Sequence, residues 1–365
     1  MKKLSAVERP TRRNFVKGAA AASVASFAAA GRARAQGPDV INVGLSPYIN
    51  QAMFYIAEDS GFFSKVGVQI RMKRFMDGAL VVAPMIAGEL DVGTMTCNAG
   101  YFNALHRGAP FRAFLCSGQA GNGRAVTTVS VRGDHYEAGV RSVKDLAQMK
   151  GKVAAVGAAG SVNQYGMASA LKLAGLDPVR DVQWQTTVAQ PDIVKQLGQK
   201  QVDVSDLTYH LAFLAQQQGI SRIIASRDEV APRSQAAIVT ASDAMLQQRR
   251  PVLVRFAMAF IHAGRIFNQV AGAPARYPET LGLIAKSIIP SDERLLTAVA
   301  PHWEWIAEDG MPNSASLMQQ QDFWADTFKM VEQKVALDRA FVAGVAEEAA
   351  RRLDAERPFG PIAIK

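Results

Sequence analysis

The feature that most constrains this chain is a residue pattern that occurs twice, far apart in the sequence. The matched segments are Val43-Gly44 and Ile49-Asn50-Gln51 in the first copy, and Val156-Gly157 and Val162-Asn163-Gln164 in the second. Each copy continues to an Asp-Val step, which lies 47 residues after the first glycine at Asp91 and 46 residues after it at Asp203. The repeat predicts two similar α/β lobes. Ligands bind outside the carboxyl ends of strands in open α/β sheets, so two facing lobes predict a cleft for a small molecule.

Apolar runs bounded by turn residues mark the strands of both lobes. Strands that alternate with helices predict mostly parallel sheets with helices on their faces. The runs at 126–131 and 236–240 are expected to carry the chain out of the first lobe and back to it. Other strands are expected at 40–45, 68–75, 90–94, 111–117, 152–156, from 182, and at 222–225. Helices are expected at 51–59 and 193–197. Three further helices are expected: one opened by Asp77-Gly78 that ends near Ala87, one that begins at Ser142, and a long one that ends at Ala174. From 242 onward the pattern is helical almost throughout and includes an amphipathic segment at 252–270.

The first 35 residues predict an export signal. Arg12-Arg13, a mildly apolar stretch at 18–30 and Ala33-Arg34-Ala35 are typical of a twin-arginine leader, with cleavage between Ala35 and Gln36. An amphipathic surface helix is the alternative. Without this segment 33 basic and 31 acidic residues remain, so the formal charge of +9 mostly reflects the leader. A nearly neutral body has little electrostatic reason to bind nucleic acid or an anionic membrane. No later run reaches the roughly 20 apolar residues of a spanning helix.

The cysteines and histidines do not predict a metal site or a cofactor. The chain has two cysteines, Cys97 and Cys116, and five scattered histidines, without a His-Glu-x-x-His or Cys-x-x-Cys motif. In an oxidising compartment the two cysteines could form a disulfide, and two buried thiols are the equally compatible alternative.

The loop at 157–161 is the strongest candidate for ligand contact in the second copy. It lies between an apolar strand and a helix, so the free N–H groups of the first helical turn favour an oxoanion there. Gly160, Ser161 and Asn163 are the candidate ligand-binding residues of this loop. Alternatively, Ser161 caps its helix and the glycines only allow a tight turn. The loop lacks the Gly-Lys-Ser/Thr of a Walker loop and the Gly-x-Ser-x-Gly of a nucleophile elbow.

The corresponding loop of the first copy offers an aromatic hydroxyl and two amides. Tyr48 provides a flat face and a hydroxyl, or packs as a lid on its own lobe. The other candidates lie where further strands end at the same cleft. The remaining candidate ligand-binding residues are Ser46, Asn50, Gln51, Asp77, Gly78, Cys97, Asn98, Gln119, Asp206 and Tyr209. Asp77 and Asp206 could instead be helix caps.

Aromatic residues gather in the C-terminal part of the chain. They are Trp303, Trp305, Phe323, Trp324 and Phe328. Their helical spacing favours core packing over a platform on which a ligand could stack.

Several short motifs resemble the nitrate/sulfonate/taurine-type periplasmic substrate-binding proteins of ABC importers, which are related to the binders of thiamine-pyrimidine precursors. The resemblance covers roughly residues 40–270, in order. The motifs are Val43-Gly44, Tyr55 to Phe63, Gly67-Val68, Ile86 to Gly93, Val143 to Leu146, Gly151-Lys152 and Leu173 to Pro178. Each is short, and the set is specific because its order is kept.

The resemblance implies a type II periplasmic binding protein fold, an α/β architecture in which each of two lobes has a mixed, mostly parallel sheet. Lobe 1 is expected at 36–128 plus 238–365 and lobe 2 at 129–237, after a signal peptide at 1–35. It further implies a periplasmic, monomeric protein that binds a small anionic solute in the interlobe cleft. A permease and an ATPase of the inner membrane would be its partners, with no cofactor and no nucleic acid.

Two other functions share this scaffold. One is an enzyme such as a desulfinase or a C–S or C–N lyase, which requires an activated nucleophile or an acid/base pair. Sulfinate-cleaving relatives use a cysteine in the first loop, where this chain has Ser46, and Cys97 with His106 is the remaining candidate pair. The other is a ligand-sensing module of a membrane receptor. We therefore predict a binding protein and not an enzyme.

Overall fold

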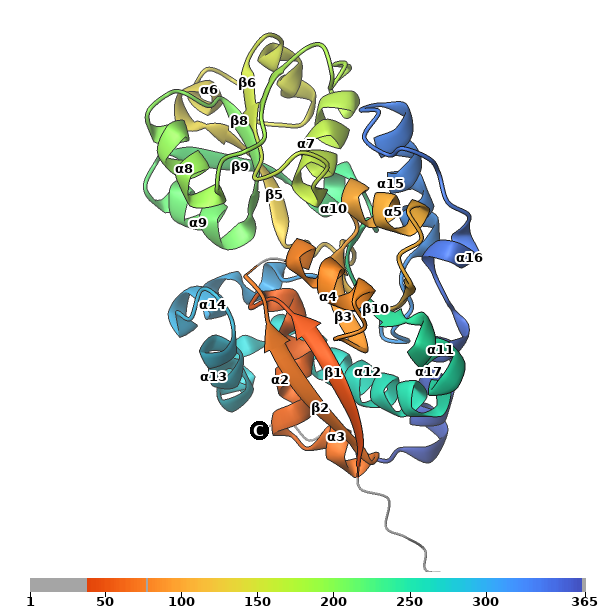
Figure 1. Cartoon of the computed structure of the whole chain (residues 1–365). Helices are drawn as coiled ribbons and strands as arrows, with labels where there is room; N and C mark the ends of the chain where they lie inside the picture. Colours follow the sequence, from red (N-terminus) through yellow and green to blue (C-terminus); the bar gives the residue numbers. More distant parts are fainter. Residues whose placement is uncertain (1–37, 77, 363–365) are drawn as a thin grey trace, which may run out of the picture. The chain divides into compact units, whose positions relative to one another are not determined.

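The computed structural model describes residues 38–76 and 78–362, and within them the strands form two five-stranded sheets. The first sheet has the order β2-β1-β3-β10-β4, and the second has the order β7-β6-β8-β5-β9 (Figure 1). We call the first sheet with its helices lobe 1 and the second with its helices lobe 2.

Each sheet combines parallel strands with one antiparallel strand in the fourth position. In lobe 1, β1 pairs in parallel with β2 and β3, whereas β10 is antiparallel to β3 and β4. In lobe 2, β6 pairs in parallel with β7 and β8, whereas β5 is antiparallel to β8 and β9. The strands of lobe 1 are β1 (Asp39–Leu45), β2 (Val68–Arg74), β3 (Val92–Thr96), β4 (Phe111–Gln119) and β10 (Gln235–Ser242). Those of lobe 2 are β5 (Thr127–Arg132), β6 (Val153–Ala155), β7 (Gln183–Gln185), β8 (Val204–Thr208) and β9 (Ser221–Ser226).

The two lobes exchange equivalent strands. The chain leaves β4 of lobe 1 to form β5 of lobe 2, and later leaves β9 of lobe 2 to form β10 of lobe 1. Both exchanged strands occupy the fourth place of their sheets. The crossing strands expected at 126–131 and 236–240 are therefore confirmed. We call 120–126 the first crossing and 227–234 the second crossing.

One aspartate has the same structural role in each lobe. Asp91 accepts the backbone N–H of Asn42 at 2.8 Å, and Asp203 accepts that of Val153 at 2.9 Å. Each carboxylate thus satisfies a backbone donor on the central parallel strand next to its own. Because of this role, the sequence repeat keeps an aspartate at this step.

The structure corrects how the two copies of the repeat align. In lobe 1 Val43 pairs with Val92, whereas in lobe 2 Ala154 pairs with Val204. The structural equivalent of Val43-Gly44 is therefore 154–155 and not Val156-Gly157. The reason is that the strands end at different places relative to the Asp-Val step, because β1 continues for two residues after Val43 and β6 for one residue after Ala154.

Helices cover both sheets and extend from lobe 1 at the C-terminal end. Lobe 1 has α2 (Ala52–Asp59), α3 (Phe62–Lys65), α4 (Val82–Ile86), α5 (Ala99–His106), α11 (Asp243–Gln248), α12 (Arg250–Gly272), α13 (Pro278–Ser287), α14 (Glu293–Val299), α15 (Ser314–Asp326), α16 (Leu337–Ala340) and α17 (Gly344–Glu356). Lobe 2 has α6 (Gly133–Glu137), α7 (Val162–Leu173), α8 (Gln190–Gly198), α9 (Tyr209–Gln217) and α10 (Arg227–Val230). Short 3-10 turns are η1 (Ile49–Gln51), η2 (Gly78–Val81), η3 (Lys144–Met149), η4 (Pro274–Arg276) and η5 (Ala300–His302).

Several expected elements differ in detail. The third strand begins at Val92 and not at 90, because Asp91 is used to hold Asn42. The helix expected from Ser142 is the 3-10 helix η3, with Ser142 donating its hydroxyl to Asp145 at 2.7 Å. The amphipathic segment at 252–270 is helix α12, which is buried on most of its surface because α2 and α17 pack against it.

Both cysteines are buried as free thiols in the described part of the chain. This outcome agrees with the second alternative stated for Cys97 and Cys116. Among residues 38–76 and 78–362, no helix is both long and apolar enough to cross a membrane.

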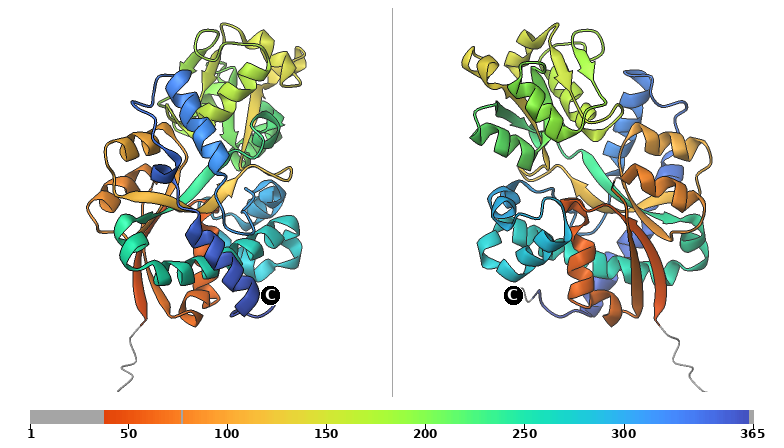
Figure 2. Two further views of the ribbon diagram at one scale, coloured as in Figure 1. Left: turned by 90° about the vertical axis from the view of Figure 1, so that its right-hand side faces the viewer. Right: turned by 60° about the vertical axis from the view of Figure 1, so that its left-hand side comes forward.

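The C-terminal aromatic residues divide into two groups. Trp303 stacks on Phe267 in the core of lobe 1, with ring centroids 5.2 Å apart. Phe323 in α15 and Phe328, two residues after that helix ends, instead contact rings of lobe 2. Phe323 packs edge-on against Tyr165 of α7 at 4.9 Å, and Phe328 against Trp184 of β7 at 6.0 Å. Figure 2 shows α15, in blue, running beside lobe 2. The expected core packing thus includes an interlobe contact.

Candidate functional site

The second crossing places an arginine where both lobes meet. Arg227 is the first residue of α10, directly after β9, and Ser226 and Glu229 form a capping box that starts this short helix. Burial raises the pKa of Asp206 in lobe 2 and those of Cys97 and Glu304 in lobe 1, and the charge of Arg227 acts in the opposite direction on all three. Arg227 therefore lies within electrostatic range of groups of both lobes.

Arg227 is buried without a partner among the residues that the structure describes. Only 1% of its surface is exposed, and Nε, Nη1 and Nη2 have no hydrogen-bond partner in residues 38–76 and 78–362. Arginine is almost never fully buried unless it is paired. A buried charged group without hydrogen bonds costs several kcal/mol or more. The planar guanidinium can offer two parallel N–H donors to a carboxylate, sulfonate or phosphate. Its setting therefore favours an anionic ligand.

Asp206, on β8, lies close to Arg227 and is fully buried. Asn163 donates its amide to Asp206 Oδ1 at 2.8 Å, and Thr127 donates its hydroxyl to Oδ2 at 3.4 Å. A Cβ on Gly166 would collide with Asp206 Oδ2 and would lie 3.2 Å from Arg227 Nη2. Burial raises the pKa of Asp206 to about 7, although Arg227 and these donors lower it. Burial thus disfavours the charged form of Asp206, and Asp206 makes no hydrogen bond to Arg227, whose side-chain nitrogens have no partner in the described chain.

Glu304 brings a second buried acid from the C-terminal part of lobe 1. It is 2% exposed, and its Oε2 has no donor in the described part of the chain. Burial raises its pKa to about 8, with Arg227 acting in the opposite direction. A Cβ on Gly118 would collide with Glu304 Oε2, so the missing side chain of Gly118 makes room for the carboxylate. Arg227, Asp206 and Glu304 form what we call the central site.

Four of the sequence-predicted residues lie at the central site or next to it. Asn163 and Asp206 are hydrogen-bonded to each other there. Cys97 is fully buried at the end of β3, and burial raises the pKa of its thiol far above the usual range. Gln119 pairs through its backbone with Trp305, the neighbour of Glu304, and its side-chain Oε1 has no donor in the described chain.

The first loop is brought to β4 of its own lobe. Ser117 donates its hydroxyl to the Asn50 carbonyl, and Gln51 donates to Asn50 Oδ1 at 3.0 Å. Ser46 and Gln51 are buried. Tyr48 is 41% exposed and donates its hydroxyl to the Met76 carbonyl at 3.0 Å.

Four other predicted residues have structural roles, and for Ser161 the helix-cap role was one of the stated alternatives. Ser161 accepts the Gln164 N–H at 3.2 Å, and Asn98 accepts the Tyr101 N–H at 2.8 Å, so both cap helices. The Gly160 carbonyl accepts the Ala99 N–H at 3.1 Å, which joins the two lobes directly. Gly78 begins η2, close to β3.

Tyr209 stacks across the lobes and Asp77 lies outside the described residues. The Tyr209 ring of lobe 2 lies 3.9 Å from that of His302 in η5, nearly parallel to it. Both rings are close in the sequence to central-site residues, since Tyr209 follows Asp206 by three positions and His302 precedes Glu304 by two. The expected signal peptide at 1–35 and its cleavage after Ala35 also lie outside the described residues.

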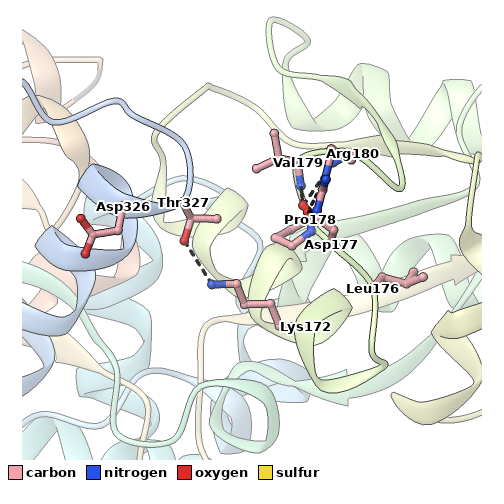
Figure 3. A pocket seen from close by; sticks show the side chains of 8 residues that line it. All are labelled: Lys172, Leu176, Asp177, Pro178, Val179, Arg180, Asp326 and Thr327. Atoms are coloured by element: carbon pink, nitrogen blue, oxygen red, sulfur yellow. Dashed lines mark hydrogen bonds and ion pairs between the residues drawn. The ribbon is translucent and has the colours of Figure 1, made fainter.

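A surface hollow lies between the end of α7 and the end of α15 (Figure 3). Lys172 donates to the Thr327 hydroxyl at 3.1 Å across it, and Arg180 pairs with Asp177 on its rim. The Arg180 side chain is 81% exposed, so these charges are already solvated. The central site is the stronger candidate because its polar groups are buried.

Sequence reasoning missed Arg227 and Glu304. A signal was present for Arg227, because the Ser226-x-x-Glu229 capping box marks a helix start, where the helix dipole disfavours a cation. Glu304 stands alone between Trp303 and Trp305, a setting that is unusual for a solvated acid. Neither signal predicts that both side chains are buried in the same region of the molecule.

Comparison with known proteins agrees with the fold and defines the family. The two mixed sheets flanked by helices have the architecture of periplasmic binding proteins. Residues 34–282 match the NMT1-like family, and the chain belongs to this family. No curated protein matches the chain by sequence.

Three solved structures illustrate the similarity. The aliphatic sulphonate binding protein SsuA from Escherichia coli is 18% identical with a TM-score of 0.64, covering 83% of this chain and 91% of that one. SsuA from Xanthomonas axonopodis pv. citri, bound to MOPS, is 17% identical with a TM-score of 0.63, covering 85% and 100%. The nitrate-binding protein NrtA from Synechocystis PCC 6803 is 12% identical with a TM-score of 0.68, covering 89% and 92%. At these identities the likeness establishes the shared fold.

Proposed function

We propose that this protein is the solute-binding component of an ABC importer and holds a small anionic solute between its lobes. The observation that carries this proposal is the buried Arg227 side chain, for which the described chain provides no hydrogen-bond acceptor. Groups from both lobes surround it, so an anion bound there would favour the closed form over the open one. Structural neighbours with sulfonate and nitrate as their named ligands support an anionic solute.

The proposal includes delivery and location. We assign the protein to the periplasm, reached through the twin-arginine leader at 1–35, where it would present the closed form to a permease and its ATPase as a monomer. The lobe boundaries first expected at 128/129 and 237/238 fall inside β5 and β10. We place them instead in the first and second crossings, since a hinge is formed by connecting segments and not by paired strands.

Catalysis by Cys97 is the weaker alternative. A catalytic thiol reacts as a thiolate, which an electropositive and partly exposed setting favours. Burial raises the pKa of the fully buried Cys97 thiol despite the charge of Arg227, so it stays protonated. This setting favours a binding role for the site.

Calorimetric titration of the mature protein with alkanesulfonates, carboxylates, nitrate and phosphate, with neutral pyrimidines for comparison, tests the proposal. At least one anion is expected to bind saturably with one-to-one stoichiometry. Replacing Arg227 by Gln should weaken that binding at least about 100-fold, because a buried charge-assisted contact is lost. Arg233→Gln, an exposed position in the same crossing, is the matched control. A folded protein that binds none of these anions would overturn the proposal.

A further inference from the structure

A segment of lobe 1 reaches across to lobe 2 outside the two crossings. It consists of α15 and the four residues that follow it, and we call residues 314–330 the α15 arm (Figure 2). Two of its rings pack on rings of lobe 2. The centroid of Phe323 lies 4.9 Å from that of Tyr165 in α7, and the centroid of Phe328 lies 6.0 Å from that of Trp184 in β7. Aromatic pairs attract each other at these separations. The arm therefore adds a side-chain connection between the lobes to the two backbone crossings.

A lysine of lobe 2 contacts the same arm twice. Lys172, near the end of α7, donates its ammonium to Thr327 Oγ1 at 3.1 Å (Figure 3). Its Nζ also lies over the Phe323 ring, 4.5 Å from the ring centroid. A cation at this distance from an aromatic face is attracted by the ring quadrupole. Because Lys172 is exposed, its contacts add less to the connection than the two ring pairs do.

Both ends of the arm are fixed to lobe 1. At its start, Gln235 of β10 donates its backbone N–H to the Ser316 hydroxyl at 2.9 Å, and Gln320 donates its amide to the Gln235 carbonyl at 2.7 Å. At its end, Asn103 of α5 donates its amide to the Met330 carbonyl at 2.9 Å. The arm therefore moves with lobe 1, and its contacts with α7 and β7 have to break when lobe 2 moves away.

The contacts with lobe 2 lie away from the hinge and beside the cleft. Gln235 follows directly after the second crossing, and α15, with 13 residues, carries the arm about 20 Å farther. There the Met330 sulfur lies 3.6 Å from the position that a Cβ on Gly160 would take. The Gly160 carbonyl in turn accepts the Ala99 N–H of lobe 1 at 3.1 Å, so two strand-to-helix loops meet across the cleft at this place. A rotation of lobe 2 about the crossings moves distant atoms the most, so opening breaks the contacts at the end of the arm.

We propose that the α15 arm stabilises the closed form of the ligand-free protein, and thereby sets the apparent affinity for the solute without contacting it. The effect on affinity rests on the proposed function, whereas the effect on closure does not. Contacts that are made only in the closed form raise its population, and the apparent dissociation constant falls in inverse proportion to that population. Lys172, Phe323 and Phe328 are thus positioning residues that act through closure.

Distance measurements by electron paramagnetic resonance test closure without any solute. The spin labels are attached through Leu80→Cys in lobe 1 and Thr187→Cys in lobe 2. Both positions are exposed and follow the edge strands β2 and β7, on the two sides of the cleft. Cys97 and Cys116 are buried, which protects them from the label. The distance between the labels is short in the closed form and longer in the open form, and we expect a sizeable short-distance population in the otherwise unchanged, ligand-free protein.

Release of the arm should shift this population toward the open form. Phe328→Ala removes a ring contact with lobe 2 and should lower the ratio of short to long distances about tenfold. Val331→Ala is the matched control, because Val331 is the next residue after the arm and is buried in the core of lobe 1, and it should leave the ratio unchanged. Lys172→Met, at an exposed position, should lower the ratio about threefold. Lys195→Met, exposed in α8, is its control.

Calorimetric titration of the same variants tests the link to affinity. Starting from equal populations of the two forms, a tenfold fall in the ratio raises the dissociation constant of the bound anion about fivefold, with one-to-one stoichiometry preserved. An unchanged dissociation constant in Phe328→Ala would overturn this link.

The remaining outcomes separate the two proposals. Equal distance distributions in wild type, Phe328→Ala and Lys172→Met would overturn the role of the arm and leave the proposed function standing. A shift in Val331→Ala as large as that in Phe328→Ala would also overturn it, because loss of packing within lobe 1 would then explain both. Expected distance shifts in a protein that binds no anion would support the arm and overturn the proposed function.

Discussion

The two crossings between the lobes each bury an arginine, and the two arginines differ in whether the chain provides hydrogen-bond partners for them. Arg124 in the first crossing donates to the carbonyls of Trp303 and Glu304 and lies over the Trp305 ring, 5.6 Å from its centroid. Arg227 in the second crossing is more deeply buried, yet none of its nitrogens has a partner in the described structure. Arg124 thus stabilises the fold. Arg227 bears a desolvation cost that the described chain does not offset, as expected for a residue whose partner is a ligand.

Removing the partnered arginine should have the largest effect on stability. Arg124→Met leaves the Trp303 and Glu304 carbonyls without their donor, and each buried unsatisfied acceptor costs about 1–3 kcal/mol. We expect the free energy of unfolding in urea to fall by about 3 kcal/mol. If the free energy of unfolding falls by less than about 1 kcal/mol, the hydrogen bonds of Arg124 contribute little to stability, and the contrast with Arg227 fails.

The same change at the second crossing should have the opposite sign. Arg227→Met removes a buried charge that has no partner in the described chain and adds an apolar side chain of similar length. We expect the ligand-free protein to gain about 1–2 kcal/mol in urea unfolding, since replacing buried charges by apolar groups is often neutral or stabilising. Anion binding should be lost in parallel. Destabilisation by more than about 1 kcal/mol would remove the contrast with Arg124.

The pH dependence of stability should reveal the acids beside Arg227. Burial raises the pKa of Glu304 from the ordinary value of 4.5 to about 8 in the folded protein, with the charge of Arg227 acting in the opposite direction. Between these values the unfolded chain releases a proton that the folded protein keeps. Its stabilising contribution is therefore full below about pH 4.5 and is lost as pH rises through about 8.

Comparison of wild type with Glu304→Gln isolates this contribution. Relative to the variant, the ligand-free wild type should lose on the order of 2 kcal/mol of unfolding free energy between pH 5 and pH 8. His210 and His262 titrate in the same range with the opposite sign, because burial lowers the pKa of each to about 4, and they cancel in this difference. Parallel pH profiles for the two proteins would contradict the assignment.

A smaller effect is expected at Gly166, which lies in α7 against the central site. Replacing a helical glycine by alanine ordinarily stabilises by up to about 1 kcal/mol. Here the new Cβ would collide with Asp206 Oδ2, so Gly166→Ala should destabilise by about 1 kcal/mol and weaken anion binding. Gly282→Ala in α13 is the control, since its Cβ would meet no atom closer than 3.8 Å, and it should be neutral or stabilising. Thermal unfolding of both variants provides the measurement.

Much of the fold could be predicted because its signals are local and repeated. Alternating apolar runs identified the crossing strands, and the recurring aspartates identified the repeat of two lobes. The alignment within the repeat was wrong by two residues, since a strand end depends on pairing with β7 and β8 and not on the Val-Gly dipeptide alone. The role of Ser161 as the N-cap of α7 was one of the predicted alternatives, because capping is a local interaction.

The sequence by itself determined two α/β lobes exchanging one strand each, because periodicity, turns and the Asp-Val steps act over a few neighbouring residues. Only the tertiary structure decided that Arg227 lacks a partner in the described chain while Arg124 has several. It also brought Glu304 to Gly118 and near Arg227. Burial and pairing depend on contacts between segments far apart in the chain, and the spacing of residues along the sequence does not carry that information.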